Sequence, residues 1–163
     1  MVSVPNAVSD DRKEVVMAPQ PFIYFLKWVA HYHKALQMYY ERASHQRHNP
    51  EVNALLAYLG QHEGTLAHII ESYEYDAPRS LLNAWFKISP VLVHIREPES
   101  MHFDADTSVS EVIDQVLKID DGLIAVYKML LRQANSEELR EALENLINEE
   151  QREEMRLMAC EQL

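Results

Sequence analysis

The sequence predicts an all-α protein in which four long helices form a bundle of two antiparallel hairpins. Four segments, 21–44, 50–75, 108–131 and 137–159, carry apolar residues at three- and four-residue steps, the period of a buried helical face. Only three of the 163 residues are glycines, which disfavours tight β-hairpins and glycine-rich phosphate loops. The loops inside each pair of helices are short, whereas residues 76–107 form a long connection, so we expect a crossover between helices two and three.

Composition and charge exclude several classes of protein. A length of 163 residues and an apolar content of 47% suit one globular domain, which we place at residues 21–163. Residues 1–20 mix polar residues with Pro5 and Pro19, so we expect an N-terminal arm there. The net charge of −11 disfavours binding to nucleic acid or anionic membranes, and no apolar run approaches the length of a membrane span. The single cysteine, Cys160, excludes an internal disulfide, and Asp10 and Asp11 speak against a secretory signal. We therefore expect a soluble, cytoplasmic protein.

Capping residues mark where three of the helices begin. Asn49 before Pro50 is typical of a helix cap followed by a proline in the first helical position. Ser108 and Glu111 have the spacing of a capping box, and Ser136 can cap the fourth helix. Inside the long connection we predict a short helix at Arg79–Lys87, whose inward residues are Leu81, Leu82, Trp85 and Phe86.

Polar residues interrupt the apolar faces of all four long helices. These interruptions are His33 in helix one, Glu63 in helix two, Asp120 in helix three, and Glu150 and Glu153 in helix four. A carboxylate on the inward face of a helix is costly unless it is paired, protonated or bound to a metal. No lysine or arginine lies on these faces, so His33 is the one internal cation that the pattern offers.

The second hairpin repeats the first at a constant shift of 87 residues. The shift relates His33 to Asp120, Tyr40 to Tyr127, Leu56 to Leu143, Leu59 to Leu146 and Glu63 to Glu150. The loops and the polar interruptions coincide without a gap. Two similar hairpins predict a bundle with a pseudo-two-fold axis, in which the polar residues meet near one level.

This plan resembles the ferritin-like superfamily, especially its rubrerythrin-like branch. That branch carries, twice, a helix with the pattern E-x(6)-Y and then a helix with E-x-x-H. The matching stretches of this sequence are His33 to Tyr40 and Glu63 to Leu66 in the first repeat, and Asp120 to Tyr127 and Glu150 to Glu153 in the second. The resemblance covers roughly residues 21–160 and implies a ferritin-like four-helix bundle with a di-iron carboxylate site at its centre.

The ligand set departs from the pattern of that family. The family residue is kept at Glu63 and Glu150, its leading glutamates are replaced by His33 and Asp120, and its histidines by Leu66 and Glu153. Leucine cannot bind a metal, so the first repeat has lost one ligand. The resemblance therefore implies an altered or degenerate di-metal site and not an iron-storage ferroxidase.

Three functions remain open at this point. One imidazole and four carboxylates could hold iron, manganese or zinc in a metal-binding or stress-related protein, with Tyr40 and Tyr127 donating hydrogen bonds to the carboxylates. A di-metal oxidoreductase acting on dioxygen, peroxide or a small organic substrate would use the same residues. Alternatively, the site holds no metal and is a hydrogen-bonded polar core with protonated acids, inside a scaffold that dimerises or binds a partner.

Aromatic residues beside the buried face of helix one suggest an interaction surface. Trp28, Tyr32 and Tyr39 fall just outside the apolar positions of this helix, where we expect them to be exposed. Exposed aromatic side chains are typical of partner surfaces. We therefore expect a homodimer that packs through helix one or helix two.

Overall fold

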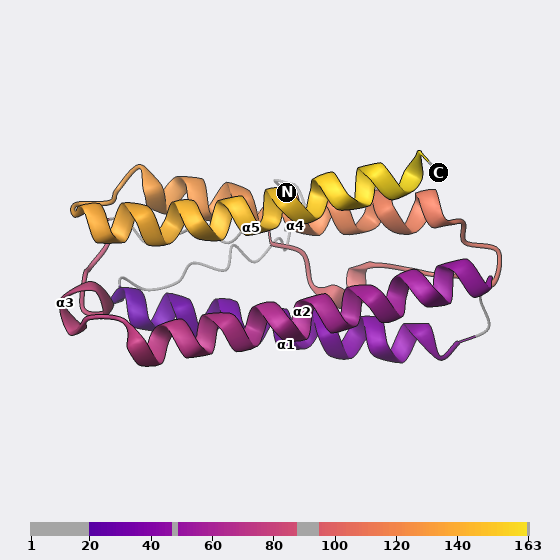
Figure 1. Cartoon of the computed structure of the whole chain (residues 1–163), viewed down its shortest axis with the longest axis horizontal. Coiled ribbons are helices and arrows are strands. Elements are labelled where there is room, and N and C mark those ends of the chain that lie inside the picture. The colour runs from indigo at the N-terminus through magenta and orange to yellow at the C-terminus, as the bar shows by residue number, and fades with distance from the viewer. Residues whose placement is uncertain (1–19, 47–48, 88–94, 163) are drawn as a thin grey trace, which may run out of the picture.

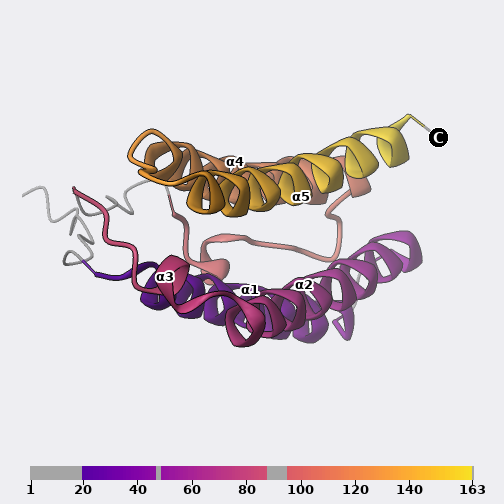
Figure 2. The ribbon, with the colours of Figure 1, turned by 60° about the vertical axis from the view of Figure 1, so that its left-hand side comes forward.

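The computed structural model describes residues 20–46, 49–87 and 95–162, and within them every regular element is helical. Helices α1 (Phe22–Ser44) and α2 (Pro50–Asp76) form one layer. Helices α4 (Val109–Leu131) and α5 (Glu137–Glu161) form the other layer, as Figures 1 and 2 show. The predicted all-α bundle of two hairpins with a long crossover is confirmed. The predicted N-terminal arm, apart from its last residue, lies outside the described residues.

The three predicted caps are present. The Asn49 side chain accepts a hydrogen bond from the backbone N–H of Glu51. Ser108 and Glu111 form the complete capping box at the start of α4, and the Ser136 side chain accepts from the backbone at the start of α5. These bonds satisfy N–H groups that a helix leaves without partners at its first turn.

Replacing Ser108 with alanine is expected to lower the free energy of unfolding by about 1 kcal/mol, because α4 then loses its side-chain cap. Urea unfolding followed by far-UV circular dichroism measures the change. The matched control is Ser72→Ala, since Ser72 is an exposed residue inside α2. A loss of stability in the control as large as in Ser108→Ala would contradict the role of the cap.

The short helix of the crossover ends earlier than predicted. Helix α3 spans Arg79–Leu82, and not the expected range 79–87. The chain leaves the helix because the N–H of Phe22 donates to the carbonyl of Ala84 at 2.8 Å, which draws this stretch against the start of α1. Trp85, expected to face inward, is 56% exposed as a result.

The crossover covers the aromatic residues beside the buried face of α1. Tyr32 donates a hydrogen bond to the carbonyl of Arg96, and Tyr39 donates one to the carbonyl of Met101. Tyr32 is buried and both Trp28 and Tyr39 are half-buried, so the expectation that all three are exposed was wrong. The hydroxyl groups of Tyr32 and Tyr39 hold the long connection against α1.

The two layers meet through a continuous apolar core. Helix packing is closest within each hairpin, α1 against α2 and α4 against α5. The largest fully buried side chains include Tyr40 of α1 and Tyr127 of α4, which the internal repeat relates to each other. No helix in the described part of the chain is both long enough and apolar enough to cross a membrane.

A buried histidine–carboxylate centre

All five polar residues predicted to face inward are buried. Their exposed fractions are 1% for His33, 4% for Glu63, 2% for Asp120, 4% for Glu150 and 3% for Glu153. They come from all four long helices, with two on α5. Burial of this many titratable side chains in one bundle needs compensation, so the partners of each one decide the chemistry of the site.

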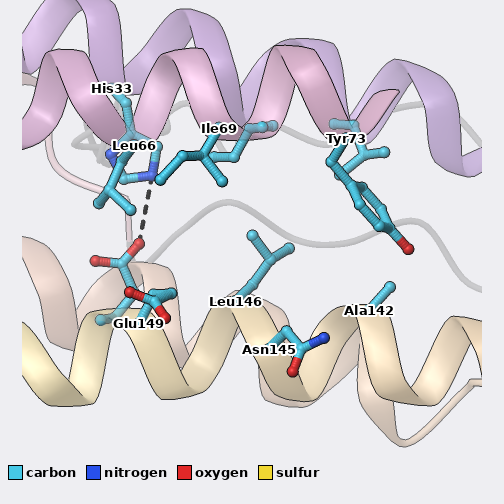
Figure 3. A pocket seen from close by; sticks show the side chains of 11 residues that line it. His33, Leu66, Ile69, Tyr73, Ala142, Asn145, Leu146 and Glu149 are labelled. Atoms are coloured by element: carbon cyan, nitrogen blue, oxygen red, sulfur yellow. Dashed lines mark ion pairs between the residues drawn. The ribbon is translucent and has the colours of Figure 1, made fainter. Parts of the chain in front are cut away.

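The imidazole of His33 lies between two carboxylates. Its Nδ1 atom is 2.6 Å from Oε2 of Glu63, close enough for a short hydrogen bond. Its Nε2 atom is 3.3 Å from Oε1 of Glu150, an ion-pair contact marked by the dashed line in Figure 3. Because Glu63 belongs to α2 and Glu150 to α5, His33 links the two hairpins. We call His33, Glu63, Asp120 and Glu150 the central cluster.

The charges of the central cluster favour a protonated His33. Burial by itself lowers the pKa of this imidazole, but the charges of Glu150 and Glu63, together with the hydrogen bond to Glu63, raise it to about 10. An imidazolium is therefore the stable form at neutral pH. Burial raises the pKa of Glu63, while the His33 cation counteracts that effect.

Asp120 is held in its neutral, protonated form. Burial, and then the charges of Glu150 and Glu63, raise its pKa well above the usual range of an aspartate. Its Oδ2 atom is buried and has no hydrogen-bond partner among the described residues. A neutral carboxyl group avoids most of the cost that an ionised carboxylate would bear there.

The two repeat-related tyrosines have different partners. Tyr127 donates a hydrogen bond to Oε1 of Glu150 at 3.3 Å. Tyr40 donates instead to the sulfur of Met101, 3.7 Å away on the crossover. Burial first, and then neighbouring carboxylates, raise the pKa of both phenols well above the usual value, so both remain protonated donors.

Glu153 belongs to a separate set of contacts. Its Oε2 atom lies 3.2 Å from the hydroxyl of Tyr58, 3.5 Å from Nε2 of His62 and 3.2 Å from the guanidinium of Arg156. The inward-facing pattern missed these three partners because none of them lies on an apolar helix face. The spacing of Tyr58 and His62 could have indicated this contact, because residues four apart on a helix lie on the same face. In the structure their rings are stacked on α2.

As arranged, these side chains do not fit a di-metal centre. Among the described residues, no group of three or more histidines, cysteines, aspartates or glutamates is placed to hold a metal ion. Both nitrogens of His33 face carboxylates, Leu66 is buried at the family ligand position of α2, and Glu153 turns to the Arg156 cation. Asp120 has the carboxylate chemistry of a ligand but is held in its neutral form.

The elements and the site define a class of protein: a four-helix bundle of two repeated hairpins, linked by a long crossover, with a buried carboxylate cluster. The solved structure of a Thermotoga maritima protein described as ferritin-like and diiron-carboxylate superposes on this chain with a TM-score of 0.61. The two sequences are 13% identical, and the match covers 88% of this chain and 95% of the other. No family model and no curated protein matches the sequence. The chain has a ferritin-like fold.

Proposed function

We propose that this chain is a ferritin-like protein, related to the rubrerythrin-like branch, whose di-metal site is degenerate. Its function is binding, as a helical scaffold, and not metal-dependent oxidation. The observation that carries the proposal is the position of His33 between Glu63 and Glu150, the two residues that keep the ligand identity of the family. An imidazolium there supplies the positive charge that buried carboxylates require, so the centre needs no metal ion for charge balance.

A cytoplasmic homodimer remains part of this proposal. Large apolar side chains are exposed on α2 and α5, and they are Tyr58, Ile69, Tyr73, Tyr75, Met155 and Met158. Exposed apolar residues that gather on neighbouring helices are typical of surfaces that bind another protein. Tyr24 and Met38 are exposed on α1 as well, but the larger set favours a partner surface over α2 and α5, and no longer one built on Trp28, Tyr32 and Tyr39.

Metal loading tests the proposed function. The full chain is treated with a chelator, incubated anaerobically with Fe²⁺ or Mn²⁺, desalted and measured by elemental analysis. We expect no stoichiometric metal in the wild-type protein, and no difference between the wild type and Glu150→Ala. Two ions per chain that disappear in Glu150→Ala would overturn the proposal and support a di-metal oxidoreductase.

A matched control separates interior from surface binding. Glu144→Ala removes an exposed carboxylate of the same helix. Metal that is lost in Glu144→Ala but kept in Glu150→Ala would be bound at the surface, and the proposal would stand. One ion per chain lost only in Glu150→Ala would also overturn the metal-free centre, and would favour a mononuclear metal-binding protein.

A further inference from the structure

A cavity of about 280 Å³ lies between α2 and α5 and ends at the central cluster. Figure 3 shows His33 and Leu66 at one end, Ile69 and Leu146 in the middle, and Tyr73 with Ala142 at the other end. Its apolar lining consists of Leu26, Leu66, Ile69, Ile70, Tyr73, Ala142 and Leu146. Ile69 is 51% exposed and Tyr73 39% exposed, so the outer side of the cavity is reached from solvent.

The polar end of the cavity offers one donor and one acceptor side by side. His33 lines this end, and its Nε2 atom is buried without a hydrogen bond to any described residue. Glu150 also lines it, with Oε1 3.3 Å from that nitrogen. The side chain of Glu149 adds a second acidic group nearby. A buried donor left without a hydrogen bond costs free energy that a suitable ligand atom recovers.

We propose that this cavity binds a small neutral molecule with an apolar body and a terminal hydroxyl group. The hydroxyl oxygen accepts a hydrogen bond from Nε2–H of His33, and its proton is donated to Oε1 of Glu150. The apolar body lies along Ile69 and Leu146 toward Tyr73. The inference rests on the proposed function in one respect: Nε2 of His33 and Oε1 of Glu150 can bind the hydroxyl group only if neither atom binds a metal ion.

The size and charge of the cavity select this class of ligand. An apolar cavity of about 150 Å³ in another protein holds benzene, so the larger volume here has room for a chain of about eight carbon atoms. A carboxylate can accept from His33 but cannot donate to Glu150, so its oxygens would lie unpaired against those of the Glu150 carboxylate. An ammonium group has no lone pair to accept the hydrogen bond from His33. A hydroxyl group meets both demands.

Three ligands with the same body and different heads test the proposal. The full chain is titrated with 1-octanol, octanoate and octylammonium by isothermal titration calorimetry at pH 7. The ligand concentrations stay below those at which the charged ligands form micelles. We expect saturable binding of one 1-octanol per chain, and dissociation constants at least about tenfold higher for the two charged ligands. Carbon–proton correlation NMR spectra of the protein should show the largest changes in chemical shift on addition of 1-octanol at the methyl groups of Leu146 and Ile69. Absence of 1-octanol binding, or octanoate binding of equal strength, would overturn the proposal.

Two matched substitutions locate the binding site. Leu146→Trp fills the middle of the cavity from a half-buried position and is expected to abolish 1-octanol binding. Leu117→Trp makes the same change at a half-buried leucine of α4 outside the cavity and is expected to leave the dissociation constant unchanged. Circular dichroism checks that both variants fold. Equal weakening of binding by both, or by neither, would show that 1-octanol binds elsewhere.

A second copy of the chain is the competing occupant of this face. Sedimentation velocity of the wild type and of Leu146→Trp, with and without 1-octanol, separates the two cases. A dimer that dissociates in Leu146→Trp, together with no calorimetric response to 1-octanol, would assign the cavity to an interface and overturn the ligand. The metal-loading experiment decides the proposed function independently, so failure of one proposal is distinguishable from failure of the other.

Discussion

Replacing His33 with leucine is expected to lower the free energy of unfolding by about 3–5 kcal/mol at pH 7, the cost of leaving buried charges without a partner. His33 is 1% exposed and lies against both Glu63 and Glu150, so its removal leaves two buried acids without a counter-charge. The loss should shrink between pH 7 and pH 5, because burial raises the pKa of Glu63 and the variant lacks the His33 cation that counteracts this rise. Urea unfolding of both proteins at the two pH values measures the difference.

Two controls show whether the loss comes from charge. His68→Leu removes an exposed histidine of α2 and is expected to change the stability by less than about 0.5 kcal/mol. Adding Glu63→Gln and Glu150→Gln to His33→Leu removes the unpaired charges and should restore part of the lost stability. A His33→Leu protein as stable as the wild type at pH 7 would contradict the buried ion pairs.

The stability of the wild-type protein is expected to fall as the pH rises from about 6.5 to about 10. The pKa of His33 is raised from 6.5 to about 10 in the folded protein, so between these values the folded state binds a proton that the unfolded state has lost. The stabilisation is fully present below pH 6.5 and disappears as the pH passes the folded-state pKa, with a slope approaching about 1.4 kcal/mol per pH unit. Urea unfolding at pH 6.5, 7.5, 8.5 and 9.5 measures this slope.

The His33→Leu variant is the control for this pH dependence. The variant keeps every other titratable side chain of the wild type, so the difference between the two slopes isolates the contribution of His33. Nitrogen NMR of the imidazole reports its protonation directly. An imidazole that titrates below pH 7 in the folded protein, with parallel stability profiles for the two proteins, would refute the buried imidazolium.

The raised pKa values of two acids act in the same direction at lower pH. Asp120 and Glu63 hold their protons in the folded state above the pH at which the unfolded chain releases them. Each therefore lowers the stability as the pH rises above its ordinary pKa. Like His33, both acids make the stability of the central cluster fall as the pH rises, and their contributions are fully present only below the ordinary pKa of each acid.

The helices and their starting points could be predicted because they depend on residues close together in the sequence. The capping box of Ser108 and Glu111 and the cap at Asn49 form within a single turn, so their spacing alone was sufficient. The end of α3 was predicted wrongly because the bond between Phe22 and Ala84 joins segments far apart in the chain. The same reason explains why Trp28, Tyr32 and Tyr39 were expected to be exposed.

The sequence by itself determined the four long helices and which polar residues face inward. Periodicity sets the inward face of a helix, and so His33, Glu63, Asp120, Glu150 and Glu153 are all buried as expected. Only the tertiary structure decided their partners. His33 joins Glu63 and Glu150, whereas Glu153 meets Tyr58 and His62 of α2 and lies outside the central cluster. Rotamers and the spacing of neighbouring helices settle such contacts within a few tenths of an ångström, and a helical period of 3.6 residues carries no information at that scale.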